Sequence, residues 1–286
     1  MKNNNKLHFT VFRYQLLPID NQFQPDLIGS VKTVEDLVEI KNQIFAESLL
    51  QLGSHYHRGK KLTIRFIYNK NDLILFKLGI QKESFLENEK LERVKHKHWP
   101  SILVAIDNKN YNQTISISQN TLAFSDSKVV KEVLSGAINS YLLKRNLKFI
   151  KRDLFNETDF WNIISENNGK ILYLKFELTS PNMANISSKL KLDLKSLKSQ
   201  NNVQNTEIKI SADPHSSLTV KKTDTVIPSL IEYSSKGGGA ISAKIRGLKK
   251  VIKTGSTEKE IIIDELELEN LPEDSIETII KNVTNV

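Results

Sequence analysis

The order of hydrophobic and polar positions predicts strands and helices from the start of the chain. Residues 7–17 alternate apolar and polar side chains and are rich in aromatic and β-branched residues, which is typical of a strand. From Thr33 to Gln51 the apolar residues recur at helical spacing, and two acids follow Thr33, where they suit the helix dipole. Residues 62–68 and 73–79 are predicted to form a hairpin across the polar tetrapeptide NKND.

The rest of the chain continues both patterns. After Pro181 the segment SKLKLDLKSLKS suits a strand or a helix equally well. The acidic segment EIIIDELEL has the alternation of a strand. Further strands are predicted at 100–107, 112–120, 147–154, 170–178, 206–212 and 240–246, and helices at 126–146 (capped by Asp126 or Ser127), 157–167 and 224–235.

Strands and helices mixed with hairpins predict an α+β fold with mixed, largely antiparallel sheets, packed helices and two subdomains. We expect a break near residues 155–170. The predicted organisation is an N-terminal α+β domain at 1–155, a basic C-terminal α+β domain at 170–257, and an acidic C-terminal segment at 258–286.

The composition, with 39% hydrophobic and 26% charged residues, is that of a soluble globular protein. No stretch approaches the ~20 apolar residues of a membrane helix, and the N-terminus lacks an apolar signal-peptide run. We therefore expect a cytoplasmic location. The absence of cysteine excludes disulfides, thiol nucleophiles and thiolate metal sites.

The net charge of +8 is unevenly distributed along the chain. Residues 1–170 carry net +7 and residues 171–257 net +8, whereas residues 258–286 carry net −7. A basic body suggests a polyanionic partner such as nucleic acid. A bias toward AT-rich codons would also raise the lysine content, so composition alone leaves both explanations open.

The segment SSKGGGAISAKIRGLKKVIKTG, residues 234–255, joins three glycines to a run of cations and contains no acid. It matches neither a Walker loop nor a dinucleotide fingerprint, because the glycine spacing and the element order both differ. Two interpretations remain: a helix C-cap and turn, or a backbone contact with phosphates. On the second, the predicted nucleic-acid-binding residues are Lys236, Gly237, Gly238, Gly239, Lys244, Arg246, Lys249, Lys250 and Lys253.

A second basic cluster, KRNLKFIKR, adds Arg145 and Lys148 to the predicted phosphate contacts. It suits a solvated helix end equally well, because cations there favour the helix dipole. A third, RVKHKH at 93–98, is expected in a loop before Trp99. Such patches would bind phosphates without reading base sequence, and no helix-turn-helix pattern is present.

Two His-x-His pairs, His55/His57 and His96/His98, are expected in exposed polar loops. Neither has a nearby acid as a third metal ligand. A metal-free ribonuclease could use one of these histidines as a general acid or base. Nuclease, serine hydrolase, kinase and zinc-protease motifs are absent, so we predict no catalytic residues, metal or cofactor.

Five blocks occur in a characteristic order along the chain: QLGSHY at 51–56, KNDLILFK at 70–77, WPSILV at 99–104, YLKFEL at 173–178 and EYSSKG at 232–237. Their order resembles the soluble A subunit of the Rex phage-exclusion system of lambdoid phages, over about residues 49–245. This resemblance implies a dimeric, cytosolic protein that binds DNA with little sequence preference and serves as the sensor for a membrane partner. The triple glycine and the acidic end depart from the family pattern.

From these observations we predict a non-enzymatic, sequence-nonspecific DNA-binding protein of an anti-phage defence system, acting as a homodimeric sensor or regulator for an effector. Two alternatives stay open. One is an RNA-directed ribonuclease or abortive-infection toxin that uses the histidines. The other is an interaction subunit whose acidic tail, 258–286, docks a partner or shields the basic groove.

Overall fold

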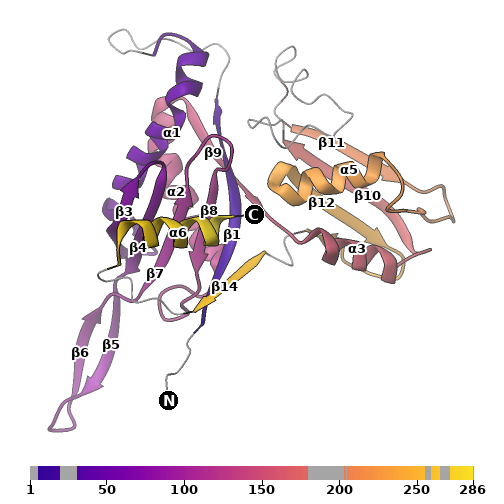
Figure 1. Ribbon diagram of the computed structural model, residues 1–286. Coiled ribbons are helices and arrows are strands. Elements are labelled where there is room, and N and C mark those ends of the chain that lie inside the picture. Colours follow the sequence, from indigo (N-terminus) through magenta and orange to yellow (C-terminus); the bar gives the residue numbers. More distant parts are fainter. Residues whose placement is uncertain are drawn as a thin grey trace. The chain divides into compact units, whose positions relative to one another are not determined.

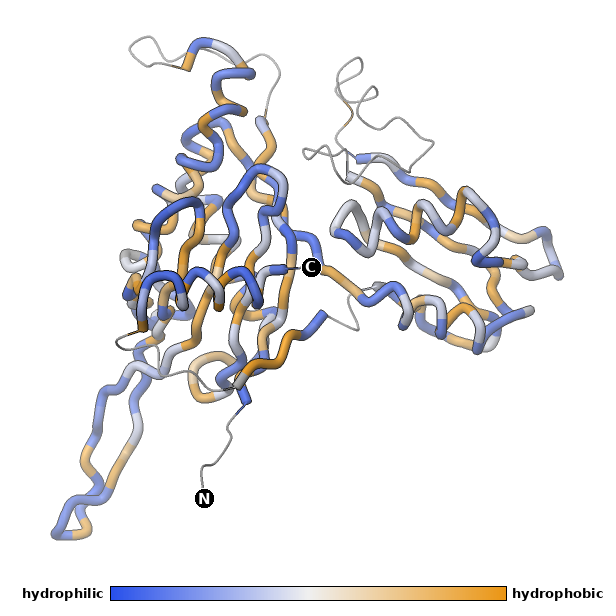
Figure 2. Tube along the Cα trace, in the orientation of Figure 1, coloured by the Kyte–Doolittle hydropathy of each residue, from blue (hydrophilic) through white to orange (hydrophobic). Residues whose placement is uncertain are grey.

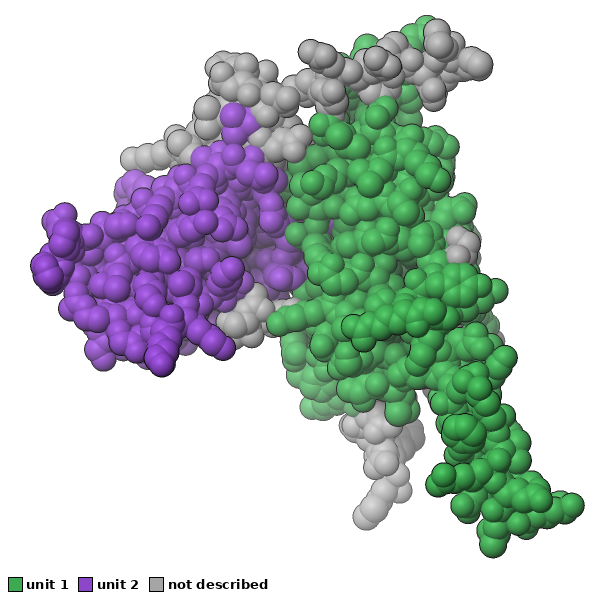
Figure 3. All heavy atoms as spheres, turned by 180° about the vertical axis from the view of Figure 1, so that it is seen from behind, with its two compact units in different colours: residues 1–10, 15–151, 260–285 green, residues 11–14, 152–259, 286 purple. Residues whose placement is uncertain are grey.

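Antiparallel strand pairs and packed helices build both parts of the chain, which confirms the predicted α+β class. A computed structural model describes residues 6–19, 31–179, 203, 205–254, 259–264 and 271–285. The chain divides into two compact units, coloured separately in Figure 3. Unit 1 comprises residues 1–10, 15–151 and 260–285, and unit 2 comprises residues 11–14, 152–259 and 286.

An eight-stranded sheet forms the centre of unit 1 (Figure 1). Apart from the two-residue β2, its strands match the strands predicted from the sequence, and Figure 2 shows hydrophobic residues along their central parts. The order across the sheet is β14 (Glu260–Asp264), β1 (Lys6–Pro18), β8 (Thr114–Ser118), β7 (Ser101–Asp107), β4 (Leu73–Ile80), β3 (Lys60–Lys70) and β2 (Tyr56–His57), and β9 (Leu147–Asp153) also pairs with β1.

The two faces of this sheet are both buried. In β4, Leu73 and Leu75 pack in one cluster with Ile276 and Ile280 of α6 (Glu273–Thr284), which crosses the strands in Figure 1. Phe76 is equally buried, and alternation along a strand turns it to the opposite face. The other helical elements of unit 1 are α1 (Val34–Leu50), α2 (Ser127–Leu142) and short 3₁₀ turns at Leu52–Ser54 and Leu143–Arg145.

The start of α1 confirms the predicted N-cap. The backbone N–H of Asp36 donates to Thr33 Oγ1 at 3.1 Å, and Thr33 N donates back to Asp36 Oδ2 at 2.9 Å. This reciprocal pair satisfies two of the N–H groups that a helix start leaves without partners. Asp126 likewise caps α2 by accepting from Val129 N at 2.9 Å.

The hairpin between β3 and β4 is tighter than the four-residue connection predicted. Only Asn71 and Asp72 form the turn, with φ of 53° and 60°. Positive φ at both central residues is the requirement of a two-residue type I′ turn, and Asn and Asp tolerate it better than most residues. The strands therefore extend through Lys70 and Leu73.

A second hairpin, of β5 (Lys82–Glu87) with β6 (Arg93–His98), corrects the prediction of a loop at 93–98. It forms a two-stranded sheet of its own and projects from unit 1 in Figure 1. Every residue of β6 is exposed. Cross-strand pairing, rather than burial, therefore gives this segment its strand conformation, and that is why the hydrophobic pattern did not reveal it.

Most of the described part of the acidic segment 258–286, residues 260–264 and 271–285, belongs to unit 1, while Lys259 belongs to unit 2. β14 pairs antiparallel with β1, from Lys6 opposite Asp264 to Thr10 opposite Glu260. In α6, Ile276, Ile280 and Val283 are buried in the core, while Glu273 and Glu277 contact Lys70 and Tyr68 of β3. Residues 258, 265–270 and 286 lie outside the described residues.

Unit 2 contains a four-stranded antiparallel sheet with two helices on one face. Its main segment begins at Arg152, before the predicted break at 155–170. The helices are α3 (Glu157–Glu166) and α5 (Val226–Tyr233), followed by a π turn at Ser234–Gly238. The strand order is β11 (Asn205–Ser211), β10 (Ile171–Thr179), β12 (Gly239–Ile245) and β13 (Ile252–Lys253), and the ambiguous segment after Pro181 lies outside the described residues.

Candidate nucleic-acid interface

The cations predicted along the glycine-rich segment lie on and beside β12 of unit 2. In β10, Leu174, Phe176 and Leu178 belong to the core cluster beneath α3 and α5. The residues between them face the opposite side of the sheet. The register places Tyr173 beside Lys244, and Lys175 beside Ser242, which is itself opposite Lys253. The face without helices therefore carries several lysines.

One end of this sheet gathers five cations, which we call the basic end: Lys170, Lys244, Arg246, Lys249 and Lys250. The backbone N–H of Arg246 donates to the carbonyl of Lys170 at 2.8 Å, so the end of β12 lies against the start of β10. All except the half-buried Lys244 are exposed. Among the described residues, none of the five makes an ion pair with an acid.

Two of the five cations also hold the local backbone. Lys244 Nζ donates to the carbonyls of Leu248 and Lys249, at 2.6 and 3.0 Å, and so closes the turn between β12 and β13. Arg246 donates through one guanidinium nitrogen to the carbonyl of Ser216 at 2.6 Å. The charges of both side chains stay at the basic end, because a carbonyl oxygen is a neutral acceptor. Lys249 and Lys250 remain as exposed cations of the turn.

Lys236 lies away from the basic end. It follows α5, near the start of β12, and the seven residues of that strand separate it from Arg246 by about 20 Å. Its amino group forms an i,i+4 ion pair with Glu232 at 2.7 Å. The structure therefore groups Lys244, Arg246, Lys249 and Lys250 and separates Lys236 from them.

The three glycines are buried, and packing explains their presence. Gly237 has φ of 84°, in the left-handed region that favours glycine. A Cβ on Gly238 would lie 2.3 Å from the ring of Tyr233, and a Cβ on Gly239 would lie 2.4 Å from the carbonyl oxygen of Glu177. The interpretation as a turn accounts for all three residues, so Gly237, Gly238 and Gly239 are not retained as phosphate donors.

Tyr233 is the side chain against which the backbone of Gly238 packs. Its hydroxyl donates to the carbonyl of Thr179 at 2.5 Å, which fixes the end of α5 to the end of β10. The side chain is buried, and this burial raises its pKa well above the ordinary value. The glycines allow β12 to begin directly beside this buried ring.

The helix-free face of the unit 2 sheet also carries residues that were not predicted from the sequence. Lys175 donates to Glu207 at 2.9 Å and to Glu177 at 3.0 Å, and these hydrogen bonds raise its pKa. Lys209 Nζ lies 4.6 Å from the ring centroid of Tyr173. The available signal was the alternation in KILYLKFEL and TEIKISA, whose polar positions share one face once the two strands pair.

The second predicted patch belongs to unit 1. Arg145 ends the 3₁₀ turn after α2, and its guanidinium lies 5.4 Å from the ring centroid of Tyr141. Lys148 is exposed on β9. Both are accessible cations of unit 1, whereas the basic end belongs to unit 2.

The histidines of the two His-x-His pairs lie in different local surroundings. His55 uses both ring nitrogens, at 2.9 Å each, on the carbonyl of Gln51 and the hydroxyl of Ser140. His57 belongs to the short strand β2, and burial lowers its pKa. His96 and His98 lie on β6 rather than in a loop. The described part of the chain contains no cluster of three or more His, Asp or Glu residues suited to a metal.

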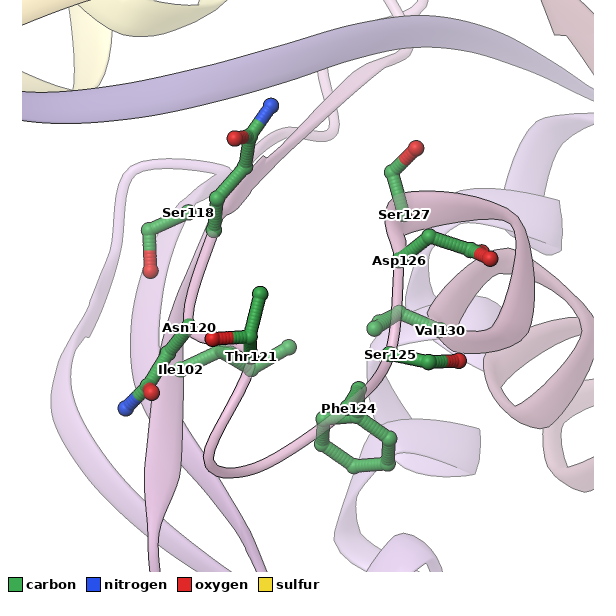
Figure 4. Close-up of a pocket in the computed structure, with 10 residues that line it drawn as sticks. Ile102, Ser118, Asn120, Thr121, Phe124, Ser125, Asp126, Ser127 and Val130 are labelled. Carbon is green, nitrogen blue, oxygen red and sulfur yellow. The ribbon is translucent and has the colours of Figure 1, made fainter.

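A pocket of about 150 Å³ lies in unit 1 beside the start of α2 (Figure 4). Three of its polar side chains form hydrogen bonds with nearby backbone groups. Ser118 accepts from Leu103 N at 2.8 Å, Asn120 donates to the carbonyl of Ser101 at 2.8 Å, and Asp126 caps α2. The described residues that line this pocket include no lysine, arginine or histidine.

None of the described helices combines the length and apolar character needed to cross a bilayer. Comparisons of the chain with protein-family models, with curated proteins and with solved structures found no match. The resemblance to the Rex system therefore stays a prediction, and the interface is interpreted from its own geometry.

Proposed function

We propose that this protein binds DNA without sequence preference, through the basic end of the unit 2 sheet. The observation that supports this most directly is the convergence of five cations on adjoining strand ends and one turn, with no acid paired to them among the described residues. Lysine and arginine side chains in such a group neutralise phosphates and release counterions, which provides affinity without reading bases.

The Rex resemblance suggests a biological role for this DNA binding. We propose a cytoplasmic, homodimeric sensor whose DNA binding regulates a membrane or effector partner in anti-phage defence. Arg145 and Lys148 would supply a second set of phosphate contacts from unit 1. Phage plaque counts on cells with and without the intact gene and its genomic neighbour would test this role.

The binding proposal is tested with Lys249 and Lys250, because no described hydrogen bond or ion pair uses their amino groups. We expect the double variant K249A/K250A to bind a labelled 20-bp duplex more weakly and with a salt slope reduced by about 2, one unit for each lost phosphate contact. Anisotropy titrations between about 50 and 200 mM salt would measure both quantities.

Lys60 and Lys61 provide a matched control. They are also adjacent, exposed lysines, but they lie in β3 of unit 1. K60A/K61A has the same net charge as K249A/K250A, so a purely global charge effect would weaken both variants equally. Equal binding by wild type and K249A/K250A would contradict the proposed site, and cleavage of RNA on the same samples would favour the ribonuclease alternative.

A further inference from the structure

The helix-free face of the unit 2 sheet carries an aromatic ring in addition to its charges. Tyr173 lies on β10 opposite Ser211 of β11 on one side and opposite Lys244 of β12 on the other. Its ring is half-buried and does not belong to the core cluster beneath α3 and α5. Phosphate binding by the basic end gives no reason for a tyrosine at this position.

The surroundings of Tyr173 suit an unpaired base. The amino group of the exposed Lys209 lies 4.6 Å from the ring centroid, so one side of the ring is accessible to a flexible side chain from the neighbouring strand. A base can occupy the same position by displacing that side chain, because lysine has several rotatable bonds. Aromatic rings on a sheet surface, flanked by cations, hold single strands by stacking on bases.

The charges of this face restrict where a strand can lie. Two residues beyond Tyr173, about 7 Å along β10, Lys175 is held between Glu177 and Glu207 at 3.0 and 2.9 Å. This triad of one lysine and two acids is net negative and repels phosphates. The favourable path therefore includes Tyr173, Lys209 and the basic end, and it excludes the half of the face beyond Lys175.

We propose that unit 2 binds single-stranded nucleic acid on this face, with a base stacked on Tyr173 and the adjoining phosphates bound by Lys209 and the basic end. Bases within a duplex are stacked on each other and cannot lie on the ring, so Tyr173 distinguishes single strands from duplexes. This inference rests on the proposed function, because the basic end supplies the phosphate contacts in both.

Anisotropy titrations with labelled (dT)12, (rU)12 and a 20-bp duplex would test the stacking role. Y173L should weaken binding of a single strand by about 5- to 100-fold, the effect of losing one stacked base, and leave duplex binding unchanged. Y173F, which keeps the ring, should bind single strands like wild type. K209E, a change at an exposed side chain, should also weaken single-strand binding. It tests whether the strand lies on this face of the sheet and leaves Tyr173 unaltered.

The variants separate this inference from the proposed function. If Y173L and Y173F bind (dT)12 and (rU)12 equally well while K249A/K250A weakens duplex binding, the single-strand inference is overturned and the proposed function stands. If wild type binds no nucleic acid, both are wrong. A Tyr173-dependent loss confined to (dT)12 or to (rU)12 supports stacking and identifies the natural ligand as DNA or RNA.

Discussion

The hydroxyl of Tyr68, on β3, donates a hydrogen bond to the carboxylate of Glu277, on α6. Asn71 Nδ2 and Lys281 Nζ donate to the same carboxylate at 3.2 and 3.0 Å. These donors, with Tyr68 the largest contributor, lower the pKa of Glu277 to about 2, and the hydrogen bond to Glu277 raises the pKa of Tyr68 to about 12. The pair fixes the C-terminal helix to the β3–β4 hairpin.

We expect the stabilisation by Glu277 to depend on pH. Because folding lowers its pKa from the ordinary 4.5 to about 2, the folded state favours the ionised form. The contribution is complete above about pH 4.5 and is lost as the pH falls toward 2. E277Q should therefore lower Tm at pH 7, and its difference from wild type should shrink between pH 4.5 and 2. E39Q, at an exposed position of α1, is the control. If the Tm of E277Q stayed as far below that of wild type at pH 2 as at pH 7, the lowered pKa of Glu277 would be contradicted.

The C-terminal helix should prove essential to unit 1. Ile280 is fully buried in the cluster that includes Phe9 and Leu75. I280A should lower the free energy of unfolding by about 2–5 kcal/mol, the usual result of removing a large buried side chain. N282A alters an exposed residue of the same helix and should change stability little. Chemical denaturation measures both, and equal stability of the two variants would contradict a role for Ile280 in the core of unit 1.

The glycine run should be intolerant of alanine. G238A would place a Cβ against the Tyr233 ring, and G239A would place one against the carbonyl of Glu177. We expect each to destabilise by about 1–3 kcal/mol or more, the cost of overpacking a filled site. The control is G136A, in α2, where nothing lies within 4 Å of the added Cβ.

Gly136 lies within a helix, so its replacement should stabilise the protein by about 0.5–1 kcal/mol. Thermal unfolding of the three variants gives the comparison. If G238A and G239A unfolded at the temperature of wild type, the packing explanation of the glycines would be wrong and a role in ligand binding would again be needed.

The β5–β6 hairpin should be dispensable for folding. β6 is exposed throughout, and Phe85 and Leu86 of β5 are 66% and 55% exposed. Replacing residues 83–97 by Asn-Gly, which joins the paired residues Lys82 and His98 through a two-residue turn, should leave Tm within a few degrees of wild type. Loss of the cooperative transition in a thermal scan would show instead that the hairpin supports unit 1.

Local patterns were sufficient for several segments that bury one face or carry their own cap. The Thr33 capping box, the Asp126 cap and the strand from Ile171 to Thr179 follow from neighbouring residues alone. β6 was missed because it buries no face, so its alternation of Val94 with cations carries no hydrophobic period. α6 was missed because its acids dominate the composition, although its apolar residues have helical spacing.

The sequence by itself determined the α+β class, the run of cations between residues 236 and 253, and the unusual glycine run. Only the tertiary structure decided that the glycines serve a buried tyrosine, that Lys236 is separated from the other cations, and that Tyr173 and Lys209 share a surface with Lys244. The physical reason is that strand pairing joins residues about 35 to 70 positions apart at a spacing of about 5 Å, and no local pattern encodes which strands become neighbours.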